Sequence, residues 1–492
     1  MIPHPPTLIF LNQALSPCGL GVFRGDIVRL SVLPRASPTD FRPILAKWSA
    51  NWYGATMPEQ ASVEVPYDYG VFSFASKAEV LDKAKAYWNP GKTQFWIDSG
   101  VPLVIDRREE YFIYDMSGKR LIDTHLNGGT YNLGHRNPEV VQAITTAMQH
   151  FDIGNHHFPA LARTALAEAL VSSAPAGLTK VIYGSGGGEA IDIAIKTARH
   201  ATQKRKVVSI TKAYHGHTGL AVGTGDERFS KLFLSDNPED FPNVPFNDLE
   251  AMENVLRNRD VAAVIMETIP ATFGFPLPAP GYLRKVKELC ERHDALYIAD
   301  EVQTGLMRTG ELWAISKEGI SPDIMVSGKG LSGGLYPIAC VVVAEHAAGW
   351  LTQDGFGHIS TFGGAELGCV AAIKTLEICS RPETRSMVHY LSDFIGQGLR
   401  RIQADYPDWL IGIRQNGLVI GLEFNDPQGA KFVMRHLYEN GVWAIFSTLD
   451  PRVLQYKPGL LLKPEIAEEL LDRTEVSICR AWAEVRSLRG PR

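Results

Sequence analysis

The central part of the chain, from about residue 160 to 375, alternates short apolar runs with longer segments in which apolar residues recur at helical spacing. The short runs predict β-strands, and the helical spacing predicts amphipathic helices. Their alternation predicts a mostly parallel sheet with helices on both faces, which is an α/β fold. The predicted strands are Lys180–Tyr183, Val207–Ile210, Ala262–Glu267, Ala295–Ala299 and Asp323–Val326, and the predicted helices include Glu189–Arg199, Leu249–Arg257 and Tyr282–Arg292.

The pattern changes on both sides of this central part. Residues 1–90 are rich in proline and aromatic residues and show no regular period, so we interpret them as an extension that packs on the body or on a partner subunit. We predict a large domain at 159–375 and a smaller α+β domain built from 91–158 and 376–492. Within the smaller domain a β-hairpin is predicted at Tyr111–Asp115 and Leu121–Thr124, and a helix at Pro138–Gln149.

The composition narrows the class of protein. The 492 residues are 45% hydrophobic and 21% charged with a net charge of -5, which is typical of a globular protein and gives no reason to expect nucleic acid or a membrane as a partner. No apolar run approaches the ~20 residues of a membrane span, and no basic residue precedes the apolar part of Met1–Ser16, so we expect no signal peptide. The six scattered cysteines form no CxxC pair. We therefore expect a cytoplasmic protein without a bound metal.

A glycine-rich turn follows the first predicted strand. It reads Tyr-Gly-Ser-Gly-Gly-Gly-Glu-Ala from Tyr183 to Ala190, and a predicted helix follows it. Glycines let backbone amides approach an anion closely, and a helix N-terminus adds a positive dipole. The turn is therefore a candidate phosphate site. Packing alone also explains such turns, and the spacing matches neither the dinucleotide fingerprint nor the Walker loop.

Two acids, Asp300 and Glu301, end another predicted strand. Because an apolar run precedes Asp300, its side chain should be partly desolvated and should need a partner. A protonated pyridine nitrogen is one such partner. Metal ligation, a role as a base, and capping of the next helix are the alternatives.

A lysine between two glycines, Lys329, follows the next predicted strand. A lysine in this position can be buried and still be reached by a ligand. Burial lowers the pKa of a lysine and makes its amine a nucleophile towards a carbonyl group. A lysine that faces solvent in a turn is the alternative.

Together these three features are more specific than any one of them. The glycine turn, Asp300 and Lys329 follow in order at the ends of strands in one predicted sheet, where open α/β sheets bind their ligands. Pyridoxal phosphate requires a phosphate site, an acid at its ring nitrogen and a lysine for its Schiff base. The sequence therefore predicts a pyridoxal-phosphate enzyme.

From about residue 90 to 480 the chain resembles the class III aminotransferases of fold type I, the ornithine, acetylornithine and 4-aminobutyrate group. The resemblance rests on several motifs that occur in the family's order. They are Ile122-Asp123, Leu133-Gly134-His135 with Pro138, Lys212–Gly216, Ile298–Gly305 with Arg308-Thr309-Gly310, Pro322-Asp323-Ile324, Ser327-Gly328-Lys329, and His358 with Ser360–Gly364.

The resemblance implies roles around the cofactor ring. Lys329 would form the Schiff base, and Asp300 would pair with the ring nitrogen. Val302 would pack on one face of the ring and Tyr214 on the other. Gln303 would lie near the ring hydroxyl.

The resemblance also implies a phosphate site and a shared active site. The backbone amides of Gly187 and Gly188 would bind the phosphate, with a contribution from Ser185, because many relatives have a hydroxyl residue where this chain has Gly188. Thr361 would reach the phosphate from a partner subunit, which implies a homodimer. Glu267 would have a structural or supporting role.

The chain departs from the family at the positions that recognise glutamate. Relatives that use glutamate and 2-oxoglutarate have an acid and an arginine that pair with each other. Alignment puts Thr272 at the acid position and Gln455 at the arginine position, although Arg452 or Lys457 could replace the arginine. Loss of both partners together is coherent, because loss of one would leave an unpaired charge.

We therefore predict an aminotransferase that moves an amino group between an amine or (ω-)amino acid and an oxo acid, aldehyde or ketone, without the usual glutamate switch. A lyase, epimerase or aminomutase on the same fold is the alternative, because each needs the same Lys329 and Asp300. A non-catalytic scaffold is a third possibility, against which both residues argue.

Overall fold

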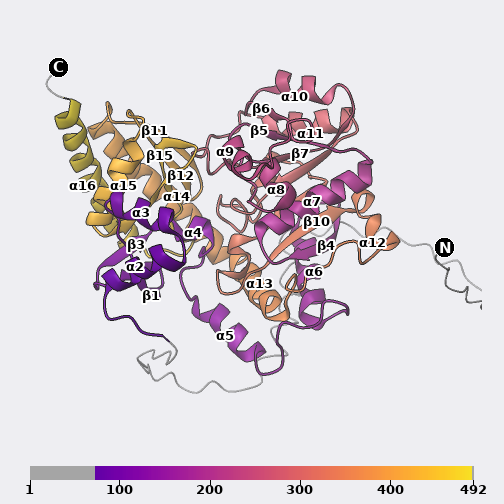
Figure 1. Ribbon diagram of the computed structural model, residues 1–492, viewed down its shortest axis with the longest axis horizontal. Helices are drawn as coiled ribbons and strands as arrows, with labels where there is room; N and C mark the ends of the chain where they lie inside the picture. Colours follow the sequence, from indigo (N-terminus) through magenta and orange to yellow (C-terminus); the bar gives the residue numbers. More distant parts are fainter. Residues whose placement is uncertain (1–71, 490–492) are drawn as a thin grey trace, which may run out of the picture. The chain divides into compact units, whose positions relative to one another are not determined.

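The computed structural model describes residues 72–489, which belong to one compact unit beginning at Asp68. A seven-stranded sheet lies in the magenta and orange part of this unit, on the right in Figure 1. All of its strands run in the same direction except β10, which is antiparallel to both of its neighbours. In sheet order the strands are β4 (Leu178–Gly184), β10 (Ala339–Ala344), β9 (Ile324–Ser327), β8 (Leu296–Asp300), β7 (Val261–Glu267), β5 (Lys206–Ile210) and β6 (Asn243–Val244).

Alternate residues of the central strands face two different hydrophobic cores. Val264 and Tyr297 pack in one core, whereas Ile265 and Ile298 pack in the other. Every residue of β7 and β8 is buried, as expected for parallel strands covered on both faces. The predicted α/β fold is therefore confirmed. The helices of this part are α6 (Leu161–Ser173), α7 (Gly187–Thr202), α8 (Gly219–Gly223), α9 (Glu227–Ser230), α10 (Leu249–Leu256), α11 (Tyr282–Arg292), α12 (Trp350–Gln353) and α13 (Glu366–Cys379), with 3-10 turns η1 (Lys231–Phe233), η2 (Ala314–Glu318), η3 (Lys329–Ser332) and η4 (Glu345–Ala347).

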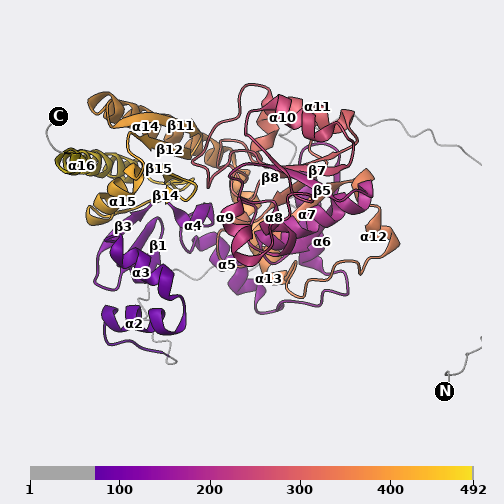
Figure 2. The same cartoon turned by 45° about the horizontal axis from the view of Figure 1, so that its top comes forward.

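There are two smaller sheets, of which one combines segments from both ends of the described chain and the other is built from residues 410–456. The predicted hairpin forms β2 and β3, and β3 pairs in parallel with β13, more than three hundred residues later. Helices α15 and α16 pack on each other beside these strands (Figure 2). The sheets are β1 (Ile105–Glu109), β2 (Phe112–Asp115), β3 (Arg120–Asp123) and β13 (Val442–Trp443), and β11 (Leu410–Asn416), β12 (Val419–Phe424), β15 (Asp450–Tyr456) and β14 (Ile445–Ser447); the helices are α2 (Lys77–Tyr87), α3 (Pro90–Asp98), α4 (Leu126–Gly129), α5 (Pro138–Ala147), α14 (Pro382–Asp405), α15 (Gly429–Glu439) and α16 (Pro464–Arg489).

Two features of the fold differ from the sequence-based prediction. Strand β10 was missed because the segment that connects it to β9 contains only the 3-10 turn η3 and no α-helix, so it does not follow the strand–helix alternation. Helix α2 lies in the range 1–90, for which we recognised no period, and it buries none of its residues. A helix without a buried stripe has no apolar spacing to recognise. Residues 1–71 of the predicted extension lie outside the described residues, and the domain boundaries at 159 and 375 remain predictions.

The sheet brings the predicted chemistry to one edge. Asp300, at the end of β8, is opposite Val326 of β9, and Gly184 and Ser327 pair with adjacent residues of β10. The ends of β4, β8 and β9 therefore lie next to one another. None of the described helices is long and apolar enough to span a membrane, and among residues 72–489 no group of three or more His, Cys, Asp or Glu side chains could hold a metal ion.

Candidate active site

Lys329 begins the η3 turn directly after β9 and has a positive φ of 43°. Its side chain lies against Gly128, where an added Cβ atom would be 3.3 Å from Cε of the lysine. Burial lowers the pKa of Lys329, whereas the negative charges of Asp300 and Glu267 act in the opposite direction. A lowered pKa increases the fraction of neutral amine, which is the nucleophilic form.

Asp300 has hydrogen bonds at both carboxyl oxygens. The Val302 N–H donates to Oδ1 at 3.0 Å, and Nδ1 of His215 lies 2.7 Å from Oδ2. The Asp300 residue is 5% exposed, so its carboxyl group is fixed in direction and largely shielded from water. The other ring nitrogen of His215, Nε2, is buried and has no hydrogen-bond partner among the described residues.

The two neighbouring acids of the motif have different environments. Glu301 accepts hydrogen bonds from the hydroxyls of Thr268 (2.6 Å) and Thr304 (2.9 Å) and from the N–H groups of Ala314 (3.0 Å) and Ile315 (2.7 Å). It therefore joins the end of β7 to the segment after β8 and is occupied by structural contacts. Only Asp300 is available for a ligand.

Glu267, at the end of β7, supports the same edge. Its Oε1 accepts the N–H of Tyr214 at 3.2 Å, and its Oε2 accepts the N–H of Ala271 at 3.0 Å. Burial raises its pKa to about 7, and the nearby Asp300 acts in the same direction. The structure thus gives Glu267 a place beside Asp300 and beside the segment that carries Tyr214.

The glycine turn is closely packed and leaves the N-terminus of α7 open. No side chain caps this helix, so its first amide groups have no partner within the helix. A Cβ atom on Gly187 would lie 3.3 Å from Cγ1 of Val302, and one on Gly188 would lie 2.8 Å from Oγ1 of Thr218. Val302 therefore lies next to the turn, between it and the Lys329 loop.

Three of the predicted site residues have less direct positions. The hydroxyl and the N–H of Ser185 both donate to Oε2 of Glu189 (2.6 and 2.7 Å), so its donors are already used. Gln303 has a buried Oε1 without a hydrogen-bond partner among the described residues. Thr361 is exposed in the loop before α13, next to Ser360, whose side chain bonds to Glu189.

The segment that faces Lys329 from the other side includes a histidine that sequence reasoning missed. His125 has a buried Nδ1 without a partner among the described residues. Burial, together with the positive charges of Lys457 and Lys329, lowers its pKa well below the ordinary value. Residues 126–129, which follow it, all have positive φ. No spacing in the sequence signals this histidine, because the local chain path places it.

The structure also shows what has replaced the acid–arginine pair. The side-chain amide of Gln455 donates to the backbone oxygen of Ala271 at 2.9 Å, so Gln455 contacts the residue that precedes Thr272. Arg452 is used elsewhere, because it pairs with Asp450 at 2.9 Å and with Glu423 at 3.1 Å.

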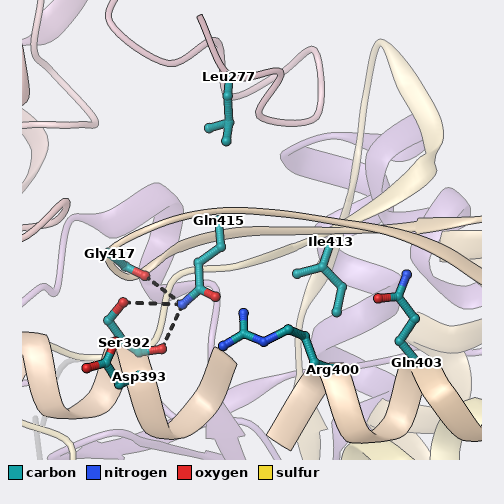
Figure 3. Close-up of a pocket in the computed structure, with 8 residues that line it drawn as sticks. All are labelled: Leu277, Ser392, Asp393, Arg400, Gln403, Ile413, Gln415 and Gly417. Carbon is teal, nitrogen blue, oxygen red and sulfur yellow. Dashed lines mark hydrogen bonds between the residues drawn. The ribbon is translucent and has the colours of Figure 1, made fainter. Parts of the chain in front are cut away.

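A separate cavity of about 370 Å³ lies between α14 and β11 (Figure 3). Leu277 and Arg400 line it, and the Gln415 amide donates there to the backbone oxygens of Ser392 (2.8 Å) and Gly417 (3.2 Å). None of the predicted site residues lines this cavity. The candidate active site is therefore the edge of the large sheet.

The residues at this edge fit pyridoxal phosphate. The uncapped start of α7 provides amide donors for a phosphate. A side chain at Gly187 or Gly188 would crowd Val302 or Thr218 and would occupy space next to these amides. Asp300 provides an oriented buried acid, and Lys329 provides a buried amine with a lowered pKa. These are the groups that would hold the phosphate, the ring nitrogen and the aldehyde carbon.

The raised pKa of Glu267 gives a prediction for the cofactor-free protein. An acid with a raised folded-state pKa stabilises the fold at low pH, and this contribution is lost as the pH rises from about 4.5 through about 7. Glu267→Gln stays neutral, so its free energy of unfolding relative to the wild type should rise by up to roughly 3 kcal/mol between about pH 5 and pH 8.5. Urea unfolding of both proteins over this pH range measures the change. A stability difference that is the same at every pH would contradict this account.

Comparison with known proteins agrees with this geometry. The model of the family "Aminotransferase class-III" matches residues 97–478. An uncharacterized aminotransferase of Archaeoglobus fulgidus is 40% identical over 405 residues, which are 82% of this chain and 95% of that protein. The ornithine aminotransferase of Toxoplasma gondii superposes with a TM-score of 0.77 at 26% identity, over 84% of this chain and 97% of that chain. A second structure of that enzyme, with a TM-score of 0.73, is described with partial occupancy of pyridoxal phosphate at its active site; it is 26% identical and covers 83% of this chain and 99% of its own. The chain therefore belongs to the class III aminotransferases, which are pyridoxal-phosphate-dependent enzymes.

Proposed function

We propose that this aminotransferase carries out its reaction at the edge formed by β4, β8 and β9, with Lys329 and Asp300 as its catalytic residues. The observation that carries the proposal is the position of two groups next to an uncapped helix N-terminus. They are the oriented carboxyl group of Asp300 at the end of β8 and the amine of Lys329 directly after β9. The family assignment does not favour the lyase, epimerase or aminomutase alternative.

The residues divide the work as follows. Bound pyridoxal phosphate supplies a carbon that accepts the substrate amine and a ring that withdraws electrons from the neighbouring carbon. Asp300 would hold a proton on the ring nitrogen, and His215 would orient Asp300 through Oδ2. Lys329 would hold the cofactor covalently and, once its amine is free, would move the proton of the substrate carbon. The lowered pKa of Lys329 suits it to act as this base.

The remaining predicted residues would hold the cofactor in place. Val302 lies beside the glycine turn and would cover one face of the ring. Tyr214 would cover the other face, and its backbone is tied to Glu267. The amides of Gly187 and Gly188 would bind the phosphate. Other proposed contacts are Gln303 at the ring hydroxyl and Ser185 at the phosphate.

The test of this proposal is a half-reaction without an acceptor. When an amine donor is added to the holoenzyme, the visible absorption band of the cofactor should bleach and stay bleached until an oxo acid is added. Lys329→Ala should lose at least about 10³-fold in the rate of bleaching, because it removes the base and the covalent link. Lys285→Ala, which changes an exposed lysine in α11, is the control and should behave like the wild type. A Lys329→Ala enzyme with full activity would overturn the proposal.

We also propose that glutamate and 2-oxoglutarate are not the preferred partners. The switch acid and arginine are absent at Thr272 and Gln455, and Arg452 is paired with other acids. The substrates would be an amine or (ω-)amino acid and an oxo acid or aldehyde. Efficient bleaching by glutamate, relative to other donors, would contradict this.

A homodimer with a shared active site is a further part of the proposal. Two segments, around residues 148–163 and 354–366, lie side by side, since the ring centroids of His157 and Phe356 are 6.1 Å apart and the Arg163 side chain donates to the backbone oxygen of Gly364 at 3.1 Å. They expose an unusual number of large apolar side chains, which is typical of a surface that binds another protein. These are Phe158, Leu161, Phe356, Ile359 and Phe362, each more than half exposed.

The exposed Thr361 in this surface allows a direct test of sharing. Suppose that Thr361 of one subunit contacts the cofactor of the other. Each dimer of one Lys329→Ala subunit and one Thr361→Asp subunit then has one active site in which both Lys329 and Thr361 are native. Refolding the two inactive variants together should then restore activity, up to about one quarter of the wild-type value at random pairing. If each subunit uses its own Thr361, the mixture stays inactive. Sedimentation of the wild type should show a dimer.

We propose a cytoplasmic location as well. All five cysteines of the described residues are free thiols, and four of them are buried. Free buried thiols are typical of a reducing compartment. Disulfide bonds in the protein isolated from its native cell would contradict this location.

A further inference from the structure

We propose that Lys457 is the residue that binds the carboxylate of the substrate, so that the donors of this enzyme are amines that carry a carboxylate. This inference rests on the proposed function of the site and names the class of its substrates. It is carried by three observations: a buried amine without an acidic partner among the described residues, its electrostatic interaction with Lys329, and a glutamine that fixes its direction.

The first observation is the lack of an acidic partner. Lys457 is 0% exposed. Its Nζ donates to Oε1 of Gln455 at 2.5 Å, and among the described residues no carboxylate lies within ion-pair distance of it. Burial and the positive charges of Arg308 and Lys329 lower the pKa of this amine, whereas Asp123 acts in the opposite direction. Its Nζ lies 5.2 Å from the ring centroid of Phe275, which favours the charged form less than an anion would. A bound carboxylate would raise the pKa and stabilise the charged form.

The second observation places Lys457 beside the reacting lysine. The N–H of Lys457 donates to the backbone oxygen of Thr124 at 2.7 Å, immediately before His125. The same segment continues to Gly128, which lies against the side chain of Lys329. Lys329 and Lys457 both act on the pKa of His125. The segment from Thr124 to Gly128 therefore contacts the backbone of Lys457 and the side chain of Lys329, and the charge of Lys329 also acts on the Lys457 amine. We infer that one substrate could contact both side chains.

The third observation is the fixed direction of the ammonium group. The side-chain amide of Gln455 donates to the backbone oxygen of Ala271 at 2.9 Å and to the hydroxyl of Ser447 at 3.0 Å. Since both donors are used in this way, its Oε1 faces Lys457. A neutral amide orients the lysine without competing with an incoming carboxylate, as an acid at this position would.

The other charges nearby favour an anion. Arg308 is 1% exposed, and its NH1 donates to the backbone oxygen of Pro458. Its NH2 is buried without a partner among the described residues. The acid on this side, Asp123, is already bonded to Nε2 of His135 (2.9 Å) and to the N–H groups of two residues that follow it. Lys457 therefore has a second basic side chain, Arg308, close enough to act on its pKa, and the acid that also acts on it, Asp123, is already bonded to other groups.

This arrangement differs from the acid–arginine pair of the relatives that use glutamate. In such a pair, the acid can hold the arginine away from the substrate when a substrate without a second carboxylate binds. Lys457 has no such partner, so it stays available in both half-reactions. We therefore expect the amino donor and the oxo acceptor to carry a carboxylate at a similar distance from the reacting carbon, as an amino acid and an oxo acid do.

The experiment compares matched donors. Holoenzyme is mixed, without an acceptor, with β-alanine, γ-aminobutyrate and δ-aminovalerate, and with propylamine, butylamine and pentylamine, which have the same chains with a methyl in place of the carboxylate. For at least one pair, the amino acid should bleach the cofactor band with a second-order rate constant about 100-fold higher or more. Lys457→Met should lose about 100-fold in this constant for that amino acid, mainly through a weaker apparent Kd for the donor, since this contact binds substrate throughout the reaction. The alkylamines should change by less than about threefold.

Two further variants separate binding from structure. Lys457→Arg should recover part of the lost affinity, and Lys463→Met, which changes an exposed lysine paired with Glu110, should behave like the wild type. Calorimetric titration with valerate, which cannot react, should show binding to the wild type and none to Lys457→Met. An equal loss for both kinds of donor, or no preference for the amino acid in any pair, would overturn the proposal for Lys457. Failure of every donor to bleach the wild type would instead overturn the proposed function.

Discussion

The buried carboxyl group of Asp300 is the feature on which the rest of the site depends. A strand end in a fully covered sheet is a costly place for an acid, because burial disfavours its charged form unless donors or a cation compensate. Here the Val302 N–H and His215 each occupy one oxygen. The acid is thus held ready for a positively charged partner, and the ring nitrogen of pyridoxal phosphate would be that partner. The neighbouring Glu301 accepts four hydrogen bonds from the protein itself. Asp300 is therefore the acid of this pair that would contact the ligand.

Groups of opposite charge act on the two buried amines of the site. The negative charges of Asp300 and Glu267, at the ends of β8 and β7, raise the pKa of Lys329, whereas burial lowers it. The positive charges of Arg308 and Lys329 lower the pKa of Lys457. Under our proposal, the acids would favour the cationic ring of the cofactor, and Lys457 with Arg308 would favour an anionic substrate.

Much of the fold and of the cofactor site could be predicted from the sequence. Parallel strands need apolar residues on both faces, so the strands up to Glu267, Asp300 and Ser327 are visible as apolar runs, and the residues that follow them must meet at one edge. The contacts made by side chains from other segments could not be predicted. His215 reaches Asp300 across 85 residues of sequence, and only the order of β5, β7 and β8 brings them together. The N–H of Lys457, which follows β15, donates to the backbone oxygen of Thr124, and the charge of Lys457 acts on the neighbouring His125. No local sequence pattern predicts this contact between distant segments.

The central claim is that Asp300 keeps the ring nitrogen of the cofactor protonated. The most direct measurement is nitrogen-15 NMR of the holoenzyme reconstituted with pyridoxal phosphate labelled at that nitrogen. The account predicts a protonated nitrogen in the wild type near neutral pH and an unprotonated one in Asp300→Asn, in which the amide cannot stabilise the positive charge. An unprotonated nitrogen in the wild type, or the same chemical shift in both proteins, would contradict it.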